Sequence, residues 1–164
     1  MRRSSPEFRR AMFTSLVVAR AAGEGALTWE RILSAILRTE QVGRFCEDAG
    51  IAISALLPLA DEAQAPSFRA CMEKIEAELA ERGHTFGLRE HVDSLQPLPI
   101  VEARQLFVHV EMFFDGAPKD APMTPLHLLG ALVEKPEIAA MLAAGGLTQE
   151  LVHNALNARE AGEY

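Results

Sequence analysis

The chain has 164 residues, of which 49% are hydrophobic and few are aromatic, and its formal net charge is −7. A chain of this length can bury roughly 70% of its unfolded surface, so it needs neither a disulfide nor a metal ion to fold. The acidic balance argues against nucleic-acid binding, which requires a clustered basic face, and the lack of a run of about 18 apolar residues argues against a membrane span. Ala and Leu dominate and β-branched runs are few, which predicts an all-α fold.

The start of the chain and the two cysteines predict a cytoplasmic protein. Residues 1–6 are polar and charge interrupts the first apolar stretch, so no signal peptide is expected. Cys46 and Cys71 form no CxxC pair and occupy apolar positions, which is typical of core thiols in a reducing compartment. Met1 and the short tail favour a freestanding protein over one that continues into a further domain.

The first half of the chain predicts four helices. Ser5 is a suitable cap for the first, and Pro6 suits its first position, where the missing N–H is not needed. A left-handed stop is expected at Gly50, after the third helix. Pro58 is expected to kink or end the fourth helix, because it has no N–H to donate. The expected helices cover 6–22, begin at the cap at 28, cover 40–49 and begin again near 53.

A fifth helix is expected after a cap at Ser67 and before Gly83, and an irregular connector follows it. This helix has no counterpart in either half. The second half again predicts four helices, and each is opened by a capping residue or a proline: Pro99, Thr124 with Pro125, Pro136 and Thr148.

The two halves follow one pattern at a constant offset of 96 residues. Residues 28–51 align with 124–147 without a gap, most matches pair apolar residues at helical spacing, and Gly50 falls on Gly146. A repeat of this length indicates two copies of one packing unit. We therefore expect two pseudo-repeats of a four-helix unit with an extra linker helix, packed as a single domain over 1–164: repeat 1 over about 6–60, the linker over 61–98 and repeat 2 over about 99–158.

Residues 124–133 read TPLHLLGALV, a capped helix with His-Leu-Leu near its start, and a glycine-stopped helix and a further capped helix follow it. This order resembles the amino-terminal domain of Clp-type AAA+ unfoldases, which also consists of two four-helix pseudo-repeats. The resemblance implies a non-catalytic protein-binding module. Its partners would be protein substrates or adaptor proteins, which it would recruit to a Clp-type AAA+ ATPase or protease, or a Clp-type ATPase that it would modulate.

The resemblance also bears on individual residues. Some members of the family bind phosphorylated arginine at a glutamate in each copy of this motif. Glu30 matches one such position, whereas Leu126 stands at the other, and Arg31 stands where the family usually has histidine. These departures weaken the case for arginine-phosphate recognition.

No motif for catalysis is present. The sequence has no GxxxxGK[ST] loop, so we expect it neither to bind nor to hydrolyse ATP. Its five histidines show no metal-ligand spacing, and His127 is expected to be a structural residue. We therefore expect no catalytic residue, no cofactor and no metal. An alternative of a different class stays open: a small helical ligand-binding regulator or enzyme that uses an internal pocket, which a thermal shift with nucleotides or metal ions would reveal.

The seam between the two halves is the predicted contact surface. Leu95, Leu98 and Ile100 lie among prolines in the connector, where a polar loop would be the default. Phe113 lies off the predicted inward face of its helix and is either core or part of an exposed patch. Together with Glu30, these residues are the candidates for partner binding. The competing interpretation is that the connector residues seal the core beneath the loop.

Overall fold

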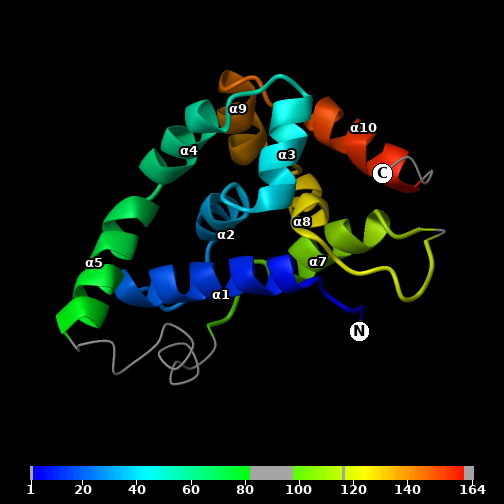
Figure 1. The fold of residues 1–164 in the computed structure, drawn as a ribbon. Helices are drawn as coiled ribbons and strands as arrows, with labels where there is room; N and C mark the ends of the chain where they lie inside the picture. The colour runs from blue at the N-terminus through cyan, green and yellow to red at the C-terminus, as the bar shows by residue number, and fades with distance from the viewer. Residues whose placement is uncertain (1, 82–97, 116, 161–164) are drawn as a thin grey trace.

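The computed structural model describes residues 2–81, 98–115 and 117–160 (Figure 1). In this part of the chain all regular elements are helices, which confirms the predicted all-α class. The helices are α1 Pro6–Ala21, α2 Trp29–Ile36, α3 Glu40–Asp48, α4 Ile53–Glu62, α5 Phe68–Glu81, α7 Ala103–Met112, α8 Pro125–Leu132, α9 Pro136–Ala144 and α10 Gln149–Glu160.

The helix bounds reproduce the repeat found in the sequence. Adding 96 to the bounds of α2 and α3 gives the bounds of α8 and α9, and the first residue of α4 maps onto that of α10. Gly50 and Gly146 both have a left-handed backbone, with φ of +73° and +94°, as expected for helix-stopping glycines. The predicted pair of four-helix units is therefore present, and α5 is the extra helix.

Two short backbone pairings, which the sequence did not predict, join the halves. Residues 3–5 pair with Met123 and residues 99–101 pair with Leu27, through four hydrogen bonds of 2.8–2.9 Å. The two pairings map onto each other at the offset of 96, so the halves are related by an approximate two-fold. Each half thus supplies the segment that completes the backbone hydrogen bonding of the other.

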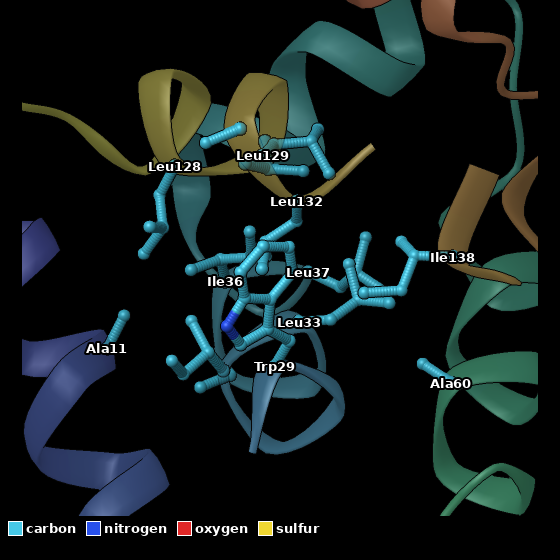
Figure 2. Close-up of a cluster of buried hydrophobic side chains, with 14 of the residues drawn as sticks. Ala11, Trp29, Leu33, Ile36, Leu37, Ala60, Leu128, Leu129, Leu132 and Ile138 are labelled. Carbon is cyan, nitrogen blue, oxygen red and sulfur yellow. The ribbon is translucent and has the colours of Figure 1, made fainter. Parts of the chain in front are cut away.

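Helices α2 and α8 meet at the centre of the molecule (Figure 2). Leu33 of α2 and Leu129 of α8 occupy equivalent positions, and both are fully buried. Figure 2 shows them among other apolar side chains of the two helices, with Ile138 of α9 and Ala60 of α4 at one side of the cluster. The hydrophobic core therefore draws on both repeats.

Three local expectations need correction or qualification. Helix α4 does not end at Pro58 but continues through it to Glu62. Leu56 and Ala60, on either side of the proline, are fully buried, and this packing offsets the lost hydrogen bond. Helix α7 begins at Ala103 and not at Pro99, because the backbone of Pro99 and Val101 bonds to Leu27 and residues 101–102 form a turn. Gly83, the expected end of α5, lies outside the described residues.

The two thiols provide a test of the core. Cys46 in α3 and Cys71 in α5 are buried and unpaired, and burial raises the pKa of Cys46 to about 11. Because the thiolate is the reactive form, both residues are expected to resist a thiol reagent at pH 8 in the native protein and to react at once in denaturant. Rapid native labelling of either thiol, followed by mass spectrometry, would contradict its placement.

Candidate functional site

Exposed large apolar side chains concentrate on one helix. Val101, Val108 and Met112 have exposed fractions of 40%, 54% and 67%. Val108 and Met112 are four residues apart and therefore lie on one side of α7, and Val101 lies in the turn that precedes the helix. We call this surface the α7 face and define it by six exposed residues: Val101, Arg104, Val108, Glu111, Met112 and Asp115.

The opposite side of α7 holds the helix on the core. Leu106 and Val110 are fully buried there, and α7 packs against α8. Burial of this side is sufficient to anchor the helix, so the fold does not require apolar residues on the outer side. Grouped apolar residues that are exposed in this way are typical of a contact surface.

A shallow hollow runs along the α7 face. Its floor includes Phe107, which is half-buried, and Phe114, which is buried. Arg2 contacts two of the lining residues: its guanidinium lies 4.0 Å from the centre of the Phe114 ring, and its Nε lies 3.7 Å from Glu111 Oε2. The hollow therefore combines an aromatic floor with a charged rim.

Charge on the α7 face is segregated along the helix axis. Arg104 lies near the start of α7, whereas Glu111 and Asp115 lie at and beyond its end. All three side chains are exposed. The face is thus positive at Arg104 and apolar in the middle. At the other end Glu111 pairs with Arg2, and Asp115 adds a second exposed carboxylate.

The connector residues predicted from the sequence lie beside this face or outside the described residues. Ile100 directly precedes Val101, and both Leu98 and Ile100 are half-buried and pack against the core. Leu95 lies outside the described residues. The exposed apolar surface nearest to the predicted seam is therefore on α7.

Phe113 also packs inward in part. It is half-buried, and the centre of its ring lies 5.5 Å from that of His153. A Cβ atom added to Gly130 would lie 2.9 Å from the Phe113 ring and 2.5 Å from Leu156, so a larger residue there would require both side chains to shift. This close approach had no signal in the sequence beyond the glycine itself.

Glu30 joins the two repeats. It lies in the first turn of α2, is half-buried, and its Oε1 accepts a hydrogen bond of 3.0 Å from Lys135 Nζ, which belongs to the other repeat. In the equivalent first turn, Leu126 is buried. The two copies of the motif are therefore different in chemistry at this position.

Arg31 and His127 occupy equivalent positions and are both buried polar residues. Arg31 is 1% exposed; its Nε donates to Glu24 Oε1 at 2.8 Å and its Nη1 donates to Gln64 Oε1 at 2.8 Å. His127 accepts a hydrogen bond from the backbone N–H of Thr124 at Nδ1, at 3.1 Å, and stacks on the Phe114 ring. Both side chains support the fold, as predicted for His127.

A second hollow lies at the seam between α3 and α8, and its polar groups are largely paired within the protein. Glu7 Oε1 accepts from the backbone N–H of Gln41 at 3.1 Å, and Gln41 Oε1 accepts from the backbone N–H of Leu126 at 2.9 Å. The backbone N–H groups of Gln41 and Leu126, in the first turns of α3 and α8, already donate to these side chains, so neither is free to bind a phosphate group.

The described residues also bear on metal sites and membrane spans. None of their His, Cys, Asp and Glu side chains form a group of three that could hold a metal ion. No described helix is long and apolar enough to cross a membrane.

Comparison with known proteins supports the fold. No protein-family model and no curated protein sequence matches the chain. The crystal structure of the Hsp104 N-terminal domain from Candida albicans is similar, with a TM-score of 0.66, 12% identity and coverage of 99% of this chain and 93% of that one. A structure from preliminary investigations of a malarial protein secretion system is similar with a TM-score of 0.65, 16% identity and coverage of 96% and 94%. The chain therefore has the fold of a Clp N-type domain.

Proposed function

We propose that this protein is a non-catalytic, cytoplasmic protein-binding module that receives unfolded substrates or adaptor proteins and presents them to a Clp-type AAA+ unfoldase. The Clp N-type fold supports a role in protein interaction at a general level. The observation that carries the proposal is the α7 face, where apolar side chains are exposed although α7 is anchored by its other side.

The proposed docking surface keeps part of the sequence prediction and extends it. Ile100 is half-buried and directly precedes Val101, where the surface begins, and the surface then continues over Val108 and Met112. An extended or helical apolar segment would fill the hollow above Phe107 and Phe114. Methionine suits such a surface because its flexible side chain adapts to partners of different shape.

Binding of an unfolded polypeptide tests the proposal. The probe is a fluorescently labelled, reduced and carboxymethylated protein that cannot refold, and the readout is fluorescence anisotropy. Wild type is expected to bind it, and a Val108→Asp, Met112→Asp double variant is expected to bind at least about tenfold more weakly, because charge on the face opposes apolar contact.

A matched control separates this effect from a general loss of surface apolarity. Phe13 on α1 is 50% exposed and lies outside the α7 face, so Phe13→Asp is expected to bind like wild type. Circular dichroism of all variants must match wild type. Equal binding by the double variant and wild type, or no binding by wild type, would rule out the α7 face as the docking surface.

A further inference from the structure

The charge pattern of the α7 face is self-complementary. Arg104 lies four residues before Val108, and Met112 lies four residues after it, between Glu111 and Asp115. If a second α7 lies antiparallel with Val108 at the two-fold axis, Arg104 of each copy lies opposite Met112 of the second copy, beside the two carboxylates. A parallel arrangement would instead oppose like charges.

We propose that two copies of this protein associate through their α7 faces, with the helices antiparallel. The two copies of Val108 meet at the centre, and the exposed Met112 side chains are covered. At each end Arg104 forms an ion pair with Asp115 of the second copy, beside Glu111, which pairs with Arg2 of its own copy. An unrelated partner would need no such pattern, whereas a second copy supplies it twice by symmetry.

The size of the face sets the strength of this dimer. Helix α7 has 10 residues, so it is about 15 Å long at about 1.5 Å per residue. A contact between two helices of this length buries less than the roughly 1,200 Å² of surface that stable complexes bury. The dimer is therefore weak and forms in the micromolar to millimolar range. It covers the same side chains as the proposed docking surface, so self-association and partner binding compete.

Sedimentation velocity tests the proposal with this protein alone. Wild type is expected to shift from monomer to dimer between about 10 μM and about 1 mM, and added salt is expected to weaken the dimer because its ion pairs are exposed at the rim. Val108→Asp is expected to remain monomeric over this range. The substituted side chain is 54% exposed, so folding is preserved, and circular dichroism checks this.

Mixing two charge variants tests the antiparallel arrangement itself. Arg104→Glu reverses the charge at one end of the face, and Asp115→Arg reverses it at the other end. Each variant alone then opposes like charges across the contact and is expected to dimerise at least about tenfold more weakly than wild type. An equimolar mixture restores both sets of ion pairs and is expected to form heterodimers at least as readily as wild type forms dimers.

Three outcomes would overturn the proposal: wild type that stays monomeric to about 1 mM, a dimer that Val108→Asp does not affect, or a mixture that associates no better than its components. The inference does not rest on the proposed function. A monomeric protein that still binds the unfolded probe would refute only the dimer, and a dimer without probe binding would refute only the docking role.

Discussion

Replacing Leu129 with alanine is expected to lower the free energy of unfolding by about 2–5 kcal/mol, and replacing Leu33 with alanine by a similar amount. Both side chains are fully buried at the contact of α2 with α8 (Figure 2). Truncation removes buried apolar area and leaves a cavity that the surrounding helices fill only in part. Urea denaturation followed by circular dichroism measures the change.

Leu151 on α10 supplies the matched control, since it is 37% exposed. Leu151→Ala is expected to change the free energy of unfolding by about 0.5 kcal/mol or less. If Leu33→Ala or Leu129→Ala unfolds at the same urea concentration as wild type, the central position of these residues is wrong.

Removing the carboxylate of Glu24 is expected to cost about 3 kcal/mol of stability. Glu24→Ala leaves the guanidinium of Arg31 buried without its anionic partner, because Arg31 is 1% exposed and Gln64, its other partner, is neutral. This loss is near the lower end of the range for breaking a buried ion pair, because the Glu24 side chain is 28% exposed and water reaches it. Urea denaturation again provides the measurement.

A second substitution distinguishes a buried charge from lost packing. Arg31→Met added to Glu24→Ala removes the unpaired charge and is expected to recover part of the stability. Glu40→Ala is a suitable control, because Glu40 and Arg44 form an ion pair whose side chains are 70% and 74% exposed. The free energy of unfolding is expected to change by about 0.5 kcal/mol or less. A Glu24→Ala variant as stable as wild type would show that Arg31 does not depend on this partner.

The repeated architecture was predictable because it has periodic signals. Apolar residues at helical spacing and glycine stops recur at one offset, and the observed bounds of α2, α3, α8 and α9 keep that offset. The pairings of residues 3–5 with Met123 and of 99–101 with Leu27 were not predictable, because a single bridge leaves no periodic pattern. The continuation of α4 through Pro58 depends on tertiary packing, which local propensity does not report.

Only the approximate location of the candidate site was predictable from the sequence. Apolar residues around Ile100 indicated a surface near the seam, but α7 is apolar on several sides, so the sequence did not indicate which side would face outward. The structure buries Leu106 and Val110 and exposes Val108 and Met112. Burial of Arg31 was also missed, since charged residues are usually exposed and its partner Gln64 is 33 residues away in the sequence.

Nuclear magnetic resonance of methyl groups tests the docking surface most directly. The protein, with labelled Val, Leu and Met methyl groups, is titrated with the unfolded probe. The methyl signals of Val101, Val108 and Met112 are expected to shift in proportion to binding, while those of Leu151, which is exposed on α10, stay in place. Shifts confined to residues outside the α7 face, or no shifts at a concentration where the probe is bound, would contradict the proposed docking of proteins on α7.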